Sequence, residues 1–199
     1  MGEYEKKREF RKTPEPGVKG ERPSWAGKEP IFVVQEHAAS TRHFDFRLEV
    51  DGVLKSWAVP KGPSMDPREK RLAVQTEDHP LAYADFEGTI PENEYGGGTV
   101  ILWDRGYYRN LREGASPPES VSEQVKNGHV TIFLEGQKIS GGYALVRTGG
   151  KDGKQWLFVK MKDDQADARR NPVSTEPESV KSKMTIDGMK GVKNLKNND

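Results

Sequence analysis

The chain contains 199 residues, of which 33% are hydrophobic and 32% are charged. Its length corresponds to about one domain, and no segment approaches the ~18 apolar residues that a membrane-spanning helix requires. The absence of cysteine excludes disulfides, thiolate nucleophiles and cysteine-based zinc sites. A formal net charge of +1 gives no overall attraction to nucleic acid. Because the first residues lack the apolar core of a secretory signal, we expect a cytoplasmic protein.

Both ends of the chain are basic, polar and poor in large apolar side chains. Residues 1–29 contain several prolines and glycines, which predicts an extended arm without a helix or a regular strand. Residues 163–199 predict a loose, partly disordered C-terminal tail with one helical turn near Thr175. Two interpretations of the basic residues stay open: solvated surface, or contacts to phosphates. The residues concerned are Arg8, Arg11, Lys12 and the lysines of 181–196.

The middle of the chain, residues 30–162, holds nearly all of the strand signals and one short helix signal. The helix is expected over 118–127, where a proline and an acid open it and Asn-Gly closes it. The expected strands are 30–36, 43–50, 53–59, 71–76, 98–103, 130–134, 143–147 and 155–160. About eight short strands with little helix predict a mostly β domain, built as an antiparallel barrel or a sandwich.

The clearest alternation of polar and apolar residues runs over 43–50 and ends at Asp51-Gly52. An Asp-Gly pair between two strand-like runs predicts a hairpin with a type I′ turn. Alternate side chains of a strand share a face. One face therefore carries Phe44, Phe46, Leu48 and Val50, and the other carries His43, Asp45, Arg47 and Glu49. A polar face of this kind is often only the solvated side of a sheet.

The polar face of this strand is also a candidate metal site. His43 and Asp45 lie two residues apart and can reach one ion, and Arg47 continues the same row. A neighbouring strand can bring His37, six residues upstream, to the same point. Two imidazoles and a carboxylate with open positions form a common catalytic metal site. His79 is a further candidate, although a lone histidine is more often a surface or capping residue.

The glycines at 96–98 suggest a phosphate-binding loop at first sight. They precede a strand and no Gly-Lys-Ser/Thr follows, so a turn or a bulge is the better interpretation. Trp57, Trp103 and Trp156 lie in apolar strand-like runs and are expected in the core. Trp25 lies in the arm, and the pattern assigns it no role.

Several longer stretches carry a resemblance to a known family. They are residues 35–49 (QEHAASTRHFDFRLE), 54–63 (LKSWAVPKGP), 77–88 (EDHPLAYADFEG) and 90–100 (IPENEYGGGTV), with 8–16 in the arm and 172–180 near the end. Over residues 1–181 or so, the chain resembles the 3′-phosphoesterase domain of bacterial DNA ligase D. Because no polymerase or ligase module accompanies it, the chain resembles a free-standing version.

The resemblance implies an antiparallel β-barrel with a polar active-site groove and a manganese-dependent enzyme, with other divalent transition metals as alternatives. Such enzymes remove a terminal ribonucleoside from a DNA primer strand and then remove the 3′-phosphate, which leaves a 3′-OH for repair or end joining. The implied partner is a DNA primer-template with a 3′-ribonucleotide or 3′-phosphate end. Separate ligase, polymerase and Ku proteins are further candidate partners. The work is expected at the nucleoid, without a membrane.

The resemblance also implies roles for individual residues. The residues that match metal ligands are His37, His43 and Asp45. Those that match the groups holding the scissile phosphate are Arg47 and His79, with Tyr83 beside them. Further active-site positions are Gln35, Lys61, Arg71 and Glu77. The arm residues associated with the phosphatase step are Arg8, Glu9 and Glu15, so we expect the arm near the groove mouth. The family usually has Asp where this chain has Glu9, which is one methylene longer.

The chemistry agrees with these residue types, because phosphoryl transfer depends mainly on charge neutralisation and positioning. Arg47 offers a fork to two phosphate oxygens, and His79 can stabilise the transition state or protonate the leaving O5′. Attack by water is favoured, and a covalent histidine intermediate stays open. The alternative function is a non-catalytic, OB-like nucleic-acid-binding barrel. A binding barrel would present aromatic and basic residues on the face that here carries His43, Asp45 and Arg47.

Overall fold

The computed structural model describes residues 2–18, 20–150 and 152–196. Its strands are β1 (Ile31–Ala38), β2 (Arg42–Val50), β3 (Val53–Val59), β4 (Lys70–Gln75), β5 (His79–Pro80), β6 (Gly88–Ile90), β7 (Gly98–Asn110), β8 (His129–Gly136), β9 (Ser140–Gly149) and β10 (Gln155–Lys160). Its helices are α1 (Gly2–Lys6), the 3₁₀-helix η1 (Leu81–Asp85), α2 (Val121–Asn127), α3 (Pro172–Thr175) and α4 (Ile186–Lys196). No helix of this described part is long and apolar enough to cross a membrane.

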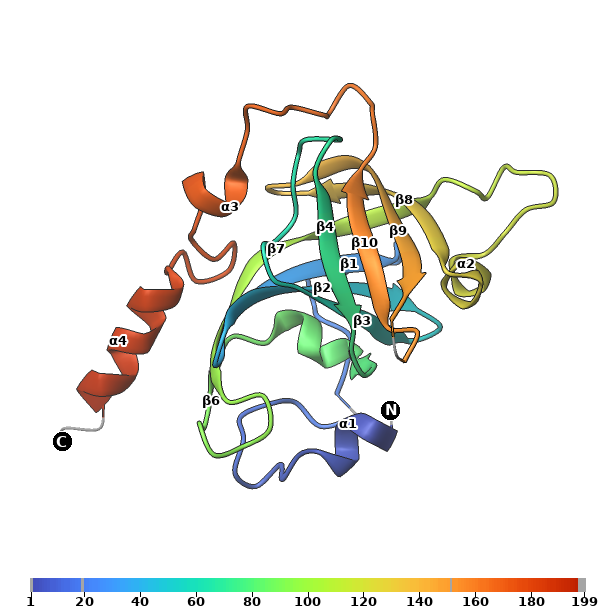
Figure 1. The fold of residues 1–199 in the computed structure, drawn as a ribbon. Coiled ribbons are helices and arrows are strands. Elements are labelled where there is room, and N and C mark those ends of the chain that lie inside the picture. Colours follow the sequence, from blue (N-terminus) through green and yellow to red (C-terminus); the bar gives the residue numbers. More distant parts are fainter. Residues whose placement is uncertain (1, 19, 151, 197–199) are drawn as a thin grey trace.

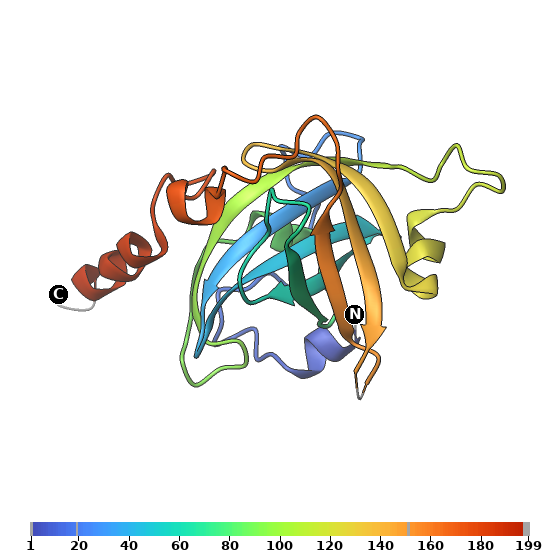
Figure 2. The same ribbon diagram turned by 45° about the horizontal axis from the view of Figure 1, so that its top comes forward.

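Eight strands close into one antiparallel barrel in the order β1-β2-β3-β4-β10-β9-β8-β7, and β7 pairs back with β1 (Figures 1 and 2). The mostly β fold is confirmed, and the structure is a barrel and not a sandwich. All eight expected strands are present, several of them longer than expected. The short strands β5 and β6 pair with β3 and β7 and were not expected, because two or three residues show no periodic pattern.

The hairpin between β2 and β3 has the expected turn. Asp51 and Gly52 both have positive φ angles, of 50° and 77°, as a type I′ turn requires. A two-residue turn of this type fixes the strand register, which pairs Val50 with Val53 and Arg47 with Ser56.

Strand β2 is buried on both of its faces. The apolar face, formed by Phe44, Phe46, Leu48 and Val50, packs in the core inside the barrel together with the three expected core tryptophans, Trp57, Trp103 and Trp156. On the outer face, Asp45 and Arg47 are only 6% and 3% exposed. Figure 1 shows η1 and the arm beneath this part of the sheet. The interpretation of a solvated polar face is therefore wrong.

The N-terminal arm is mostly irregular, but its first residues form α1, which the sequence did not predict. Tyr4 in this helix is fully buried, and its hydroxyl donates to the carbonyl of Pro16 at 2.7 Å. The helix therefore depends on one aromatic side chain that packs against distant residues. Trp25 is half-buried, with its ring centroid 6.4 Å from that of Tyr107.

The C-terminal segment is more structured than the expected loose tail, since it contains α3 and α4. The indole N–H of Trp103 and the ammonium of Lys138 donate to the carbonyl of Glu176 at 2.9 and 2.7 Å. The backbone N–H of Val180 donates to the carbonyl of Leu102 at 2.9 Å. These contacts attach the segment to one end of the barrel. The last three positions of the tail, 197–199, lie outside the described residues.

The expected helix is present as α2, and it is capped at both ends. Ser120 is the N-cap and forms a capping box with Glu123, while Gly128 ends the helix in the left-handed conformation. The helix begins three residues after Pro118, so this proline precedes the helix and does not occupy its first turn.

A buried carboxylate holds the turn between β8 and β9 against β7. Asp104 is fully buried, and its Oδ1 accepts the backbone N–H groups of Arg105, Gln137 and Lys138 at 2.9–3.1 Å. Its Oδ2 accepts the backbone N–H of Ile139 at 2.9 Å. Both carboxylate oxygens are thus committed as acceptors.

Asp104→Asn should lower the free energy of unfolding by ~1–3 kcal/mol, because an amide donor would then face a buried N–H group. Urea denaturation followed by tryptophan fluorescence measures this change. Asp164→Asn is the matched control, since Asp164 is exposed and lies outside this network. An unchanged unfolding free energy for Asp104→Asn would contradict the role of the carboxylate.

Candidate metal and phosphate site

A polar pocket of about 190 Å³ lies on the outer face of β1 and β2, between η1 and the arm. Its lining includes nine residues expected from the sequence, namely Arg8, Glu15, His37, His43, Asp45, Arg47, Glu77, His79 and Tyr83. Gln35 lies directly behind them, bonded to Arg47. The pocket thus collects most of the expected site from the arm, β1, β2, β5 and η1.

The strand register brings the three expected metal ligands together. Antiparallel pairing of β1 with β2 sets His37 opposite His43, and Asp45 is the next residue on the same face of β2. Their candidate ligand atoms all lie within 4.8 Å of one another. His37 Nδ1 and His43 Nε2 are 3.9 and 3.7 Å from the two carboxylate oxygens of Asp45. These separations are too long for hydrogen bonds and suit donors that share one ion at about 2.0–2.2 Å each.

The hydrogen bonding of His43 and the pKa of His37 also fit metal binding. His43 Nδ1 lies 2.8 Å from the carbonyl of Thr41 and donates to it, which leaves Nε2 facing Asp45. Burial lowers the pKa of His37, against the opposing attraction of the Asp45 carboxylate. His37 is therefore neutral at neutral pH, which is the form that binds a metal. Two imidazoles and a carboxylate fit a divalent transition-metal ion.

Arg47 is fixed beside this group by three neighbouring strands. Its Nε donates to Gln35 Oε1 at 2.7 Å, its Nη1 to Ser56 Oγ at 2.9 Å and its Nη2 to Asp45 Oδ2 at 3.1 Å. Its guanidinium carbon lies 4.8 Å from the centroid of the Tyr83 ring. Its Nη1 also lies 3.0 Å from His79 Nδ1, so both sides of Nη1 already face protein atoms. Nη2 keeps one hydrogen beyond its bond to Asp45, and this hydrogen is available for an anion.

His79 is neutral in this environment. Its pKa is well below the ordinary value of 6.5, because the ring is buried and because Arg47 and Arg8 lie beside it. Its Nδ1 lies 2.9 Å from the carbonyl of Glu77 and donates to it, and Nε2 accepts from Arg8 Nη2 at 3.4 Å. In the protein without substrate, His79 therefore carries no positive charge at neutral pH.

The arm contributes a second guanidinium to the pocket. Arg8 donates to Glu15 Oε1 at 2.7 Å and to Glu77 Oε1 at 3.1 Å, and Thr13 donates to the other oxygen of Glu15 at 2.9 Å. The side chains of Arg8 and Glu15 are 5% and 0% exposed. The arm therefore packs over the groove, as the sequence predicted.

Besides Gln35, three expected residues do not line this pocket. Glu9 is exposed and pairs with Lys12 at 2.7 Å. Lys61 and Arg71 line a separate pocket beyond the end of β3, where Arg71 donates to Glu69 at 2.6 Å.

The structure also adds residues that the sequence analysis missed. Ser56 contacts both Arg47 and His79, and the two-residue hairpin turn predicts its pairing with Arg47. Tyr95 lines the pocket from the loop between β6 and β7. Tyr4 has its ring centroid 5.1 Å from that of His79, and nothing periodic in the arm marks it.

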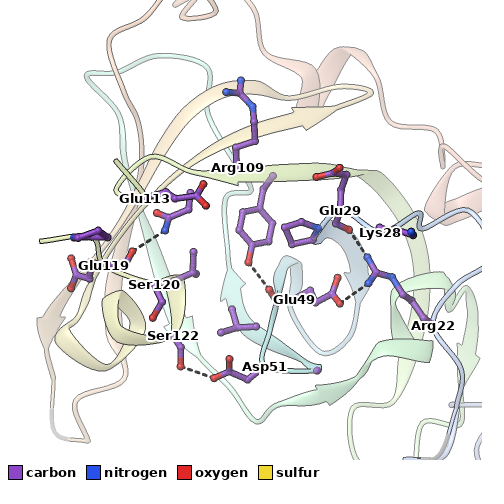
Figure 3. A pocket seen from close by; sticks show the side chains of 17 residues that line it. Arg22, Lys28, Glu29, Glu49, Asp51, Arg109, Glu113, Glu119, Ser120 and Ser122 are labelled. Carbon is purple, nitrogen blue, oxygen red and sulfur yellow. Dashed lines mark hydrogen bonds and ion pairs between the residues drawn. The ribbon is translucent and has the colours of Figure 1, made fainter. Parts of the chain in front are cut away.

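A larger cleft, of about 790 Å³, lies at the other end of β2 (Figure 3). Several of its charged side chains have partners within the cleft: Arg22 pairs with Glu49 at 3.1 Å, and Ser122 donates to Asp51 at 2.6 Å. Within the described ranges, only His37, His43 and Asp45 group as metal ligands. The smaller pocket is therefore the candidate site.

A sequence model of the DNA Ligase D 3′-phosphoesterase domain matches residues 35–147, which is more than half of the chain. The chain belongs to this family. The matched range contains the whole metal-ligand group, together with Arg47 and His79, while Arg8 and Glu15 precede it. The resemblance read from the sequence motifs is confirmed.

Two relatives are full-length proteins of end joining. The chain is 48% identical over 190 residues to the multifunctional non-homologous end joining protein LigD of Pseudomonas aeruginosa, which covers 94% of this chain and 22% of that protein. It is 45% identical over 162 residues to the multifunctional non-homologous end joining DNA repair protein LigD of Mycobacterium tuberculosis. This match covers 81% of this chain and 20% of that protein. The matched part of this chain thus spans about a fifth of the length of these relatives.

His37→Ala and His43→Ala should each weaken manganese binding by more than the ~10–100-fold typical of losing a residue that only orients a ligand. Electron paramagnetic resonance of free Mn²⁺ during titration measures the affinity. His129→Ala is the control, because His129 is exposed and lies outside the pocket. Equal manganese affinity in the wild type and all three variants would remove the assigned site.

Arg8→Met should raise the pKa of His79, because one of the two guanidinium groups that disfavour its protonation is removed. NMR titration of the His79 ring resonances measures the direction of this pKa change. Arg109→Met, which replaces an exposed arginine, is the control. A His79 pKa below that of the unfolded chain also means that stability falls as the pH drops below about 6.5. An unchanged His79 titration in Arg8→Met would contradict the coupling.

Proposed function

We propose that this chain is a metal-dependent DNA 3′-end-processing phosphoesterase. It removes a 3′-terminal ribonucleoside from a primer and then the 3′-phosphate, which leaves a 3′-OH for repair or end joining. The observation that supports this most directly is one pocket in which His37, His43 and Asp45 adjoin the buried guanidinium of Arg47. The alternative of a non-catalytic binding barrel is less well supported, since histidines and carboxylates line this face.

The proposed metal site consists of His37, His43 and Asp45. A divalent ion held there supplies a Lewis acid for a phosphate oxygen and lowers the pKa of bound water. We propose manganese, with other divalent transition metals as alternatives, because imidazole and carboxylate donors suit several of these ions.

Arg47 is proposed to orient the scissile phosphate. Its fixed guanidinium keeps one hydrogen on Nη2, which can donate to a non-bridging phosphate oxygen, while Nη1 is held by Ser56 and His79. Because Asp45 bonds to Arg47 and also faces His37 and His43, the phosphate is held next to the metal ligands.

His79 is proposed as the group that handles the proton. A phosphate in the pocket adds negative charge beside the ring and raises its pKa, so that the neutral ring can gain a proton. The protonated ring can then donate to the leaving O5′. Water is the proposed nucleophile, since the other two histidines of the pocket face Asp45 as metal ligands.

The arm is proposed to serve the phosphatase step. A terminal phosphate monoester carries more negative charge than a diester, so it gains more from a second guanidinium. Arg8 provides this group, oriented by Glu15 and Glu77. Glu9 is exposed and is not part of this proposal. Lys61 and Arg71, on the neighbouring surface, are proposed to contact flanking DNA phosphates.

The proposed substrate and main partner is a DNA primer-template with a 3′-ribonucleotide or a 3′-phosphate. The printed names of the relatives describe non-homologous end joining. Separate ligase, polymerase and Ku proteins are therefore proposed as partners in that process.

A primer that ends in one ribonucleotide, incubated with Mn²⁺, should release a nucleoside and then phosphate, which mass spectrometry of the products detects. Arg47→Ala should lose on the order of 10²–10³ in rate and still bind manganese, because Arg47 is not a ligand. Circular dichroism checks that this variant folds, and the exposed Arg109→Ala is the control. If the wild type releases neither product with any divalent transition metal, the proposed function is wrong.

A further inference from the structure

Tyr95 is an aromatic side chain that the proposed mechanism does not use. It is 48% exposed and lies at the rim of the candidate pocket, in the loop between β6 and β7. Among the large apolar side chains that are exposed in the described part of the chain, it alone lines this pocket. An exposed aromatic ring at the entrance of a polar pocket requires an explanation beyond folding.

The loop that carries Tyr95 is closely packed against the site. Within it, Glu94 N–H donates to the carbonyl of Pro91, and Gly97 N–H donates to the carbonyl of Glu94, both at 3.0 Å. A Cβ on Gly98 would lie 2.3 Å from the carbonyl oxygen of Ala38, and φ at Gly98 is 139°. Only glycine permits this approach to the end of β1, directly after His37. The backbone therefore places the end of the loop that carries Tyr95 against the strand that carries His37.

Two cations of the arm approach the Tyr95 ring. Lys7 Nζ lies 3.3 Å from the hydroxyl and 4.8 Å from the ring centroid. The guanidinium carbon of Arg8 lies 5.5 Å from the same centroid. Both cations also pair with Glu77. The ring is thus in contact with side chains that line or border the candidate pocket.

The size of the pocket limits what it can enclose. Its volume of about 190 Å³ is below the ~300–1,000 Å³ of pockets that enclose small organic ligands. The pocket suits a phosphate group, and the nucleosides attached to that phosphate have to extend across the rim. Every nucleobase presents a π face to an aromatic ring at such a position.

We propose that Tyr95 stacks on a nucleobase that flanks the scissile phosphate at the primer 3′ end. This inference rests on the proposed function. Because stacking does not depend on base identity, the site accepts any of the bases. Tyr95 is thus a positioning residue for the substrate, and it acts on the nucleotide and not on the phosphate.

The test combines protein variants with primers that lack one base. On a complete primer, Tyr95→Leu should lower kcat/KM about 5–150-fold, mainly through KM, as expected for the loss of one stacked base. Tyr95→Phe keeps the ring and should retain most of the activity. Two further primers are used, one abasic at the terminal nucleotide and one abasic at the penultimate nucleotide. On one of these two primers, Tyr95→Leu and the wild type should have the same kcat/KM. That primer identifies which base is stacked.

The controls separate stacking from a structural role. Leu111→Ala truncates a residue that is 43% exposed and lies outside the pocket. This variant should have the wild-type kcat/KM on the complete primer and on both abasic primers. If Tyr95→Leu loses the same factor on complete and on both abasic primers, Tyr95 only supports the arm through Lys7 and Arg8, and the inference is wrong.

Failure of the proposed function gives a different result. If the wild type is inactive on every primer, the same variants are compared by their affinity for a primer with 2-aminopurine at its 3′ end, measured by fluorescence. Weaker binding by Tyr95→Leu than by Tyr95→Phe then supports stacking without catalysis. Equal affinities overturn it.

Discussion

Arg47 is a buried cation, and the arrangement of the whole pocket follows from the need to pair it. A buried charge is tolerated only when it is paired and hydrogen-bonded. Arg47 obtains these partners from three consecutive strands: Gln35 of β1, Asp45 of β2 itself and Ser56 of β3. The Tyr83 ring covers its guanidinium from η1. On the outer face of the sheet, the polar contacts of Arg47 thus connect β1, β2 and β3. On the inner face, the same strands are held together by the apolar core.

The charges of the pocket largely compensate one another. The cations Arg47, Arg8 and Lys7 are in contact with the carboxylates of Asp45, Glu15 and Glu77. A phosphate entering this balanced group gains little net attraction from it. A divalent ion at the three donor atoms would add the missing positive charge. Under the proposed function, the binding of metal and the binding of phosphate would therefore depend on each other, with Asp45 in contact with both groups of residues.

Segments outside the matched family range complete the fold and the site. Tyr4 and Arg8 of the arm cover His79 from one side, and Tyr83 contacts it from η1. At the end of the chain, Glu176 and Val180 bond to the barrel. A barrel without these segments would expose the buried outer face of β2. The arm is therefore part of the domain, although its composition alone predicts an extended chain.

The sequence by itself determined the features that depend on neighbouring residues. Alternation over 43–50 assigned Asp45 to one face and the phenylalanines to the other, and Asp51-Gly52 defined the hairpin that pairs Arg47 with Ser56. The alternation also placed His43 on the face of Asp45, while the family followed from the resemblance of the long motifs and not from periodicity. The strands β5 and β6 were missed, because a strand of two or three residues is too short to show an alternating pattern.

Only the tertiary structure decided the features that depend on residues far apart in the chain. Burial between Arg8 and Arg47 keeps His79 neutral. Because both arginines are far from His79 in the sequence, no local pattern predicts this environment. Glu9 is exposed although the adjacent Arg8 is buried, and no periodic pattern in this irregular arm distinguishes the two residues. Burial, ionisation and the path of an irregular segment are set by non-local contacts, and local sequence fixes only the direction of each side chain along a strand.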